Sequence, residues 1–270
     1  MCLLCCPVCG LPLSRKERAA RCRNGHSFDY AKEGYLNLLA GRHKAGALSG
    51  DSREMALARR AFLDKGYFAP LRDALAAYIQ AHCSDGPALD LCCGEGYYSP
   101  ALQKNGNEVY AFDLSKEMVR LAAKRRAAQC FVANISSIPL PSGSIDTAIH
   151  LFAPFHDAEF SRIMRAGGTL LTVVPGRRHL FEMKQVLYDA PYENDEALPE
   201  APSFSVAEKH VVRAAATLAC QADIAALLHM TPYGVRSPRE GIARLEALDT
   251  LTTELEFVIC ALKPKKAEAS

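Results

Sequence analysis

Several features that mark other protein classes are missing from this sequence of 270 residues. No stretch approaches the roughly 18 consecutive apolar residues that a membrane-spanning helix requires. The chain does not open on a basic segment followed by an apolar run, so nothing resembles a secretory signal peptide. It also has no low-complexity run and no internal repeat. We therefore expect a globular cytoplasmic protein without a membrane partner.

The 11 cysteines are concentrated rather than spread, since five of them fall within the first 22 residues. A disulfide framework would distribute its cysteines through a small secreted chain, so the clustering indicates a metal site. Structural zinc takes four nitrogen or sulfur ligands in tetrahedral geometry. The sequence offers such a set in Cys6, Cys9, Cys22 and His26. Cys2 and Cys5 are left over and are rivals for the first ligand position.

The net charge of the chain is small, only +2, but the charged residues are unevenly distributed along the sequence. Residues 1–82 hold 13 Lys and Arg against 7 Asp and Glu, a net of +6, whereas residues 83–270 hold 19 against 23, a net of −4. A basic N-terminal part is expected if that part contacts phosphates, and a chance imbalance of exposed charges is the alternative. The basic residues between or beside the zinc ligands are Arg15, Lys16, Arg18, Arg21 and Arg23.

Hydrophobic periodicity predicts the organisation of the remaining chain. Two helices are expected first, one from residue 53 that ends near Gly66 and one at 70–82. Strands and helices then alternate, which favours a parallel, doubly wound α/β sheet. The expected strands are 88–92, 108–112, 130–134, 144–152, 168–174, 209–217 and 254–262; the expected helices are 97–104, 115–126, 157–165, 222–228 and 240–248. Residues 189–202 are rich in proline and acidic residues and are expected to form a surface loop.

A glycine-containing turn follows the first of these strands and indicates a nucleotide-like cofactor. Gly94 and Gly96 let the backbone approach a ligand closely, and Asp113 closes the next strand, where its carboxylate can accept both hydroxyls of a ribose. The third glycine that a pyrophosphate would need is absent, which favours S-adenosylmethionine. Asn134, at the end of the third strand, is placed either to meet the adenine amino group or to cap its own loop.

With these residues identified, the chain resembles the bacterial 23S rRNA (guanine-N(1))-methyltransferase family, some of whose members are linked to macrolide resistance. The resemblance covers nearly the whole chain and includes the four zinc ligands. It also rests on the segments Phe28–Asp29, Ala31–Leu39, Gly50–Asp51, Ala58–Asp64, Asp90–Tyr98, Pro175–Leu180 and Met230–Pro232.

The resemblance implies a class I methyltransferase with a Rossmann-like sheet and a small N-terminal zinc ribbon that holds one structural zinc ion. We expect residues 1–45 to form the zinc-binding RNA-recognition module, and residues 46–270 to form the methyltransferase domain with a helical lead-in at 46–86. The family further implies a homodimer, a 23S rRNA hairpin as substrate, and transfer of a methyl group from S-adenosylmethionine to N1 of a guanine.

The resemblance also assigns cofactor contacts. They carry over to Gly94, Glu95 and His179, and to Phe68, which stands where the family has a tyrosine. Phe68 keeps the stacking surface but not the hydroxyl. Cys92 stands where relatives carry glycine, so its side chain would crowd the cofactor unless it points into the sheet.

The catalytic base is not assigned. In the loop after the fourth strand, Phe152 or Phe155 can stack on an extruded base and His156 or Asp157 can take the N1 proton. Alternatively, both phenylalanines belong to the core and Asp157 caps the next helix. Two other functions stay open: a methyltransferase for a small molecule, and a zinc-ribbon RNA-binding protein whose methyltransferase half is inactive.

Overall fold

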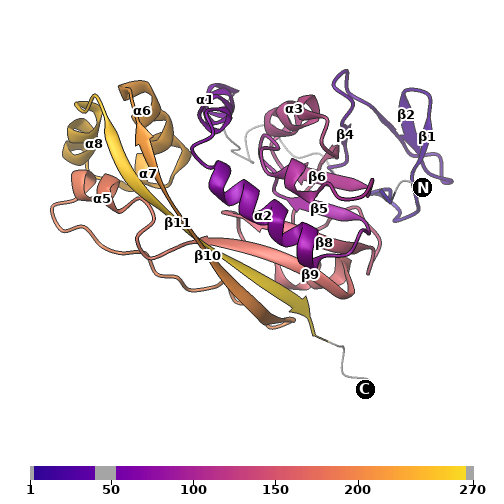
Figure 1. The fold of residues 1–270 in the computed structure, drawn as a ribbon. Coiled ribbons are helices and arrows are strands. Elements are labelled where there is room, and N and C mark those ends of the chain that lie inside the picture. The colour runs from indigo at the N-terminus through magenta and orange to yellow at the C-terminus, as the bar shows by residue number, and fades with distance from the viewer. Residues whose placement is uncertain (1–2, 40–52, 266–270) are drawn as a thin grey trace.

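The computed structural model describes residues 3–39 and 53–265, and Figure 1 shows their arrangement. The predicted domain boundary at residue 45 lies outside the described residues, as do Cys2, Gly50 and Asp51. Within the described ranges no helix is both long and apolar enough to cross a membrane.

An eight-stranded sheet organises the chain, with the strand order β10-β11-β9-β8-β5-β6-β7-β4. Its strands are β4 (Leu36–Asn37), β5 (Ala88–Leu91), β6 (Val109–Asp113), β7 (Gln129–Val132), β8 (Ile145–Leu151), β9 (Met164–Pro175), β10 (Phe204–Leu218) and β11 (Leu251–Pro264). The strands from β9 to β4 are all parallel, as the alternating pattern predicts. β11 runs antiparallel to β9, and β10 antiparallel to β11, so the whole sheet is mixed. Three helices connect β10 to β11, and the two strands pair antiparallel.

Eight helices lie among the described residues. They are α1 (Arg53–Asp64), α2 (Ala69–His82), α3 (Lys116–Arg125), α4 (Asp157–Ile163), α5 (Phe181–Leu187), α6 (Gln221–Met230), α7 (Tyr233–Arg236) and α8 (Arg239–Glu246). Gly66 lies just beyond α1 with φ +83° and donates its N–H to the Leu63 carbonyl at 2.9 Å, so the predicted glycine end is present. The Ser115 hydroxyl caps α3 by accepting from Met118 N at 3.4 Å.

The prediction of a helix at 97–104 is wrong in length. Only a single 3₁₀ turn, Ser99–Leu102, forms there. Pro100 supplies no N–H to a longer helix, and the backbone of Gln103 is already extended. The sequence pattern also missed β4, α5 and α7.

Both faces of the sheet are covered, as in a doubly wound fold. On one face α2 packs through Leu71, Leu75 and Ile79, and α3 packs beside it. On the other face α4 packs through Phe160 and Ile163, and the N-terminal segment adds its own buried side chains to that core.

The N-terminal segment is a small antiparallel sheet of β1 (Ser14–Lys16), β2 (Ala19–Arg21) and β3 (Ser27–Asp29). Hydrogen bonds also join this segment to the domain of the large sheet. Leu3 N donates to the Tyr110 hydroxyl at 3.1 Å, and Cys5 N donates to the Pro139 carbonyl at 2.8 Å. In Figure 1 this segment lies at one end of the molecule, and α5, α6 and α8 lie at the other, beyond the long twisted strands β10 and β11.

Candidate functional site

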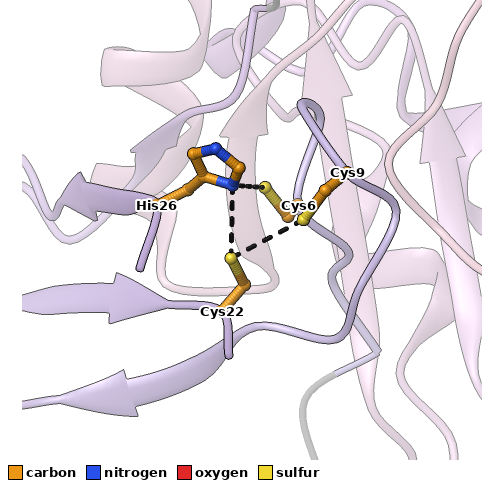
Figure 2. Close-up of side chains that lie close together, drawn as sticks. All are labelled: Cys6, Cys9, Cys22 and His26. Atoms are coloured by element: carbon orange, nitrogen blue, oxygen red, sulfur yellow. Dashed lines mark hydrogen bonds between the residues drawn. The ribbon is translucent and has the colours of Figure 1, made fainter. Parts of the chain in front are cut away.

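Four side chains of the N-terminal segment converge on one point, as Figure 2 shows. The Nδ1 atom of His26 lies 3.4 Å from the Sγ atoms of both Cys6 and Cys22, and the Sγ atoms of Cys9 and Cys22 are 3.7 Å apart. Two sulfurs bound at about 2.3 Å to one tetrahedral zinc ion lie about 3.7 Å from each other. The spacing therefore fits zinc, and it includes all four predicted ligands.

The same geometry favours the predicted ligand register over one that uses Cys5. The thiol of Cys5 lies 3.7 Å from the carbonyl oxygen of Leu3 and is not part of the cluster. Cys6 lies in the cluster instead, with its side chain buried.

A cavity of about 670 Å³ opens at the carboxyl ends of the parallel strands. This volume lies in the range of pockets that enclose a small organic ligand. Six of the seven predicted cofactor residues line it, namely Phe68, Gly94, Glu95, Asp113, Asn134 and His179. Gly96 does not line the cavity. A Cβ atom at Gly96 would lie 2.9 Å from the Cβ of Ala122, so this glycine lets the turn pack closely on α3.

Asp113 joins the ends of two neighbouring strands at the cavity wall. Its Oδ2 accepts from Gly94 N at 3.0 Å, and its Oδ1 accepts from Ser115 N at 2.8 Å. The carboxylate is thereby oriented where the sequence predicts a ribose, on the side of the cavity formed by the glycine turn.

Two more carboxyl groups, those of Glu95 and Asp90, lie under the same turn. Only Glu95 was predicted from the sequence as a cofactor contact. The Glu95 side chain is buried and accepts from Arg125 Nε at 2.8 Å, but its Oε1 has no hydrogen-bond partner among the described residues. Asp90 is buried too and accepts from the Ser99 hydroxyl at 2.6 Å. Burial raises the pKa of each carboxyl to about 7. The hydroxyl of Tyr98, on the cavity wall, is likewise buried without a described partner.

An aromatic wall forms the next part of the cavity. The ring of His179 lies 4.6 Å from that of Phe257 and 6.2 Å from that of Phe68, measured between centroids. Burial lowers the pKa of His179 to about 3, so the imidazole is neutral at physiological pH. Tyr67 cannot replace the missing hydroxyl of Phe68, because it points to α6 and donates to Asp223 Oδ2 at 2.7 Å.

The loop after β8 separates the residues that the sequence grouped together. Phe152 is 51% exposed and lines the cavity, whereas Phe155 packs against His150 and Phe160 in the core. Asp157 begins α4 but does not cap it; its carboxylate accepts instead from the backbone N–H of Ser203 at 3.1 Å and from the Ser203 hydroxyl at 2.6 Å. His156 is not among the lining residues. Only Phe152 of these residues is therefore placed to meet a base in the cavity.

Two open questions at the cavity rim concern Asn134 and Cys92. The Oδ1 atom of Asn134 accepts from the backbone N–H and the hydroxyl of Ser136, both at 3.0 Å, so the loop-capping role is present although the residue also lines the cavity.

Cys92 has φ +56° and is half-buried, and its side chain packs against the core of the sheet while still reaching the cavity wall. Burial raises the pKa of its thiol to about 12, which keeps it neutral.

This donor set suits S-adenosylmethionine. The cavity combines apolar and aromatic walls with the carboxyl groups of Asp90, Glu95 and Asp113, a lining that a positively charged nucleoside can use. The unpartnered Glu95 Oε1 and Tyr98 hydroxyl are polar atoms that a ligand can satisfy.

Comparison with known proteins matches both parts of the chain. Residues 4–46 match the zinc-ribbon family "RlmA, N-terminal", and residues 88–172 match a methyltransferase domain. A 23S rRNA (guanine(748)-N(1))-methyltransferase of Streptomyces fradiae is 37% identical over 189 residues, covering 67% of this chain and 66% of that protein. A proposed 23S rRNA (guanine-N(1)-)-methyltransferase of Micromonospora griseorubida is 36% identical over 201 residues, covering 66% of this chain and 67% of that protein.

The chain belongs to the 23S rRNA (guanine-N(1))-methyltransferase family. It spans about two thirds of the length of these two relatives. A solved structure of a proposed type II methyltransferase from Anaeromyxobacter dehalogenans has a TM-score of 0.51 and 23% identity, and covers 70% of this chain and 94% of its own. That likeness supports the methyltransferase fold.

The family resemblance, the fold and the zinc ribbon predicted from the sequence are thus confirmed, and the chain has the fold of an S-adenosylmethionine-dependent methyltransferase. Which side chains contact the cofactor, and where the domains divide, stay predictions.

Proposed function

We propose that this protein transfers a methyl group from S-adenosylmethionine to N1 of a guanine in a hairpin of 23S rRNA. The observation that carries the proposal is the occurrence, in one chain, of the RlmA-type zinc ribbon and a methyltransferase cavity, together with relatives named for that reaction. A small-molecule methyltransferase leaves the zinc ribbon without a role, and an inactive RNA-binding protein leaves the methyltransferase cavity without one.

S-adenosylmethionine supplies the methyl group as a sulfonium. In the transfer, the bond from N1 to the methyl carbon forms as the bond from sulfur to that carbon breaks, and the N1 proton passes to solvent water. The residues of the chain bind and orient, which is the main requirement of a direct displacement. Asp113 holds the ribose, Phe68 and His179 provide the aromatic wall, and Phe152 offers a ring to the extruded base.

The zinc ribbon is suited to contact phosphates. Its basic side chains are exposed, and among the described residues none of them forms an ion pair: Arg15, Lys16, Arg18, Arg21 and Arg23. Because the metal fixes the backbone between them, their positions are fixed too. Phosphate contacts of this kind give strong salt dependence and little sequence selectivity, so target choice should come from hairpin shape and from the extruded guanine.

Charge reversal at Arg18 and Arg23 together is expected to weaken binding of the RNA hairpin and to flatten its salt dependence, while the affinity for S-adenosylmethionine is unchanged. The measurement is the dissociation constant for the hairpin between about 50 and 200 mM salt. Lys209 and Arg239, exposed residues outside the ribbon, provide a matched control with the same change in net charge. An unchanged salt slope in the Arg18 and Arg23 variant, with methylation intact, would move RNA recognition to another surface.

The proposal includes a homodimer in the cytoplasm, as the resemblance described in the sequence analysis implies. Light scattering of the purified protein should give twice the mass of the chain, and the mass of a single chain would contradict it.

The function is tested in cells with and without the gene, by digesting 23S rRNA and measuring 1-methylguanosine. We expect the modified nucleoside to disappear with the gene and to return with its expression. Equilibrium dialysis with labelled S-adenosylmethionine separates the alternatives, because an inactive protein would take up none, and a small-molecule methyltransferase would take it up without modifying RNA.

A further inference from the structure

The end of the cavity away from the glycine turn is lined by three tyrosines. Tyr188 follows α5, Tyr192 lies in the next loop, and Tyr233 begins α7. The ring centroid of Tyr188 lies 5.4 Å from that of Tyr192 and 6.5 Å from that of Tyr233. None of these three tyrosines is among the predicted cofactor residues. We call these three residues the tyrosine end.

A buried lysine lies directly behind the tyrosine end. Lys184 of α5 is fully buried, and its Nζ donates to the Tyr192 carbonyl at 3.0 Å and to Asn194 Oδ1 at 2.6 Å. The same nitrogen lies 4.4 Å from the ring centroid of Tyr192 and 5.7 Å from that of Tyr233. Among the described residues no carboxylate oxygen lies within 4.0 Å of it. A buried charge is normally paired, so this ammonium, held only by neutral acceptors and rings, is an unusual feature.

Asn194 connects the tyrosine end to the cofactor end. Its Oδ1 also accepts from the Tyr233 hydroxyl at 3.3 Å, and its Nδ2 donates to the carbonyls of Gly176 at 2.8 Å and His179 at 3.1 Å. The tyrosine end is therefore adjacent to His179, which belongs to the aromatic wall. Burial lowers the pKa of His179, and the positive charge of Lys184 lowers it further.

We propose that the tyrosine end is the subsite for the target guanine, and that Lys184 supplies a positive charge behind it. This inference rests on the proposed function and names where its substrate binds. A base extruded from RNA is held by aromatic stacking, which the tyrosines and Phe152 provide. Guanine gains negative charge on N1 and O6 as its N1 proton leaves, and a nearby cation stabilises that charge.

Other charged groups around Lys184 are mostly paired among themselves. Burial lowers the pKa of Lys184, and the negative charge of Glu193, in the same loop as Tyr192, acts in the opposite direction and favours the ammonium form. On α8, Arg244 forms an ion pair with Asp189, and on β11 Glu256 pairs with Arg213 of β10. Arg236 of α7 lies at the cavity wall and adds a second positive charge to that end.

The test uses the full-length protein and a 23S rRNA hairpin that the unaltered protein methylates. Tyr192→Ala, at a position 52% exposed, should raise KM for the hairpin at least tenfold, and Tyr192→Phe should restore it. The single-turnover rate should rise with pH as the N1 proton is lost. In Lys184→Met we expect the midpoint of that rise to shift to higher pH, by on the order of one unit. The sign follows from the charge, since losing a cation makes the N1 proton harder to remove. A purely structural role for Lys184 would lower the rate equally at every pH.

Thermal unfolding and titration with S-adenosylmethionine check that each variant is folded and binds the cofactor. If Lys184→Met does not fold, Tyr192→Ala and Tyr233→Ala in the same assays test the subsite, because each removes an aromatic ring from the tyrosine end. Wild-type KM in the folded alanine variants, with wild-type pH dependence in Lys184→Met where it folds, would overturn the guanine subsite while the proposed function stands. If the unaltered protein methylates no RNA, both the function and the subsite are wrong.

Discussion

Replacing Cys9 with serine is expected to release the zinc ion and to abolish methylation of RNA. Zinc loses one of three thiolates, and a segment with so little core of its own is stabilised largely by the metal. We expect residues 1–40 to unfold while the cavity still binds S-adenosylmethionine. Zinc content by elemental analysis, limited proteolysis and cofactor titration measure the three effects.

Cys5→Ser is the matched control, because Cys5 is the neighbouring cysteine outside the cluster. It should keep one zinc ion per chain and full activity. Full zinc content in Cys9→Ser, or loss of zinc in Cys5→Ser, would show that the ligand set is wrong.

Asp113→Ala is expected to weaken binding of S-adenosylmethionine by about tenfold to a hundredfold. Loss of hydrogen bonds to a charged group costs about 1.5–3 kcal/mol, and each 1.4 kcal/mol is a factor of ten in the dissociation constant. The change also removes the acceptor of Gly94 N and Ser115 N, so part of the effect is a loosened glycine turn. Calorimetric titration gives the affinity, and thermal unfolding without cofactor gives the structural part.

Asp113→Asn separates the two contributions, since it keeps one acceptor oxygen for the backbone and loses the charge. We expect it to unfold at nearly the wild-type temperature and to bind the cofactor more weakly than wild type. Wild-type affinity in both variants would make Asp113 a purely structural residue at the edge of the sheet.

The parts of the fold that follow from local patterns were predictable. The stripe Leu71, Leu75 and Ile79 identifies α2, and the Ser115 cap identifies the start of α3. Strand β4 has only two residues, and it exists because Leu36 and Asn37 pair with β7 nearly one hundred positions later. No local signal marks such a pairing.

The same distinction holds for the candidate site, between residues that are close together in the sequence and residues that only packing brings together. The zinc ligands and the glycine turn are close in sequence and have characteristic spacing, so both could be found there. The tyrosine end could not, because Tyr188 and Tyr233 come together only through packing of the C-terminal helices. Lysine is usually exposed, and nothing in the sequence around Lys184 shows that Asn194 and the loop around it cover its side chain.

The central claim is that this chain methylates N1 of a guanine in 23S rRNA. The most direct measurement incubates the purified protein with 23S rRNA and S-adenosylmethionine that carries a deuterated methyl group, followed by nuclease digestion and mass spectrometry of the nucleosides. We predict deuterated 1-methylguanosine, absent when Cys9→Ser replaces the wild type. Label on another nucleoside, or on none while the protein binds the cofactor, would contradict it.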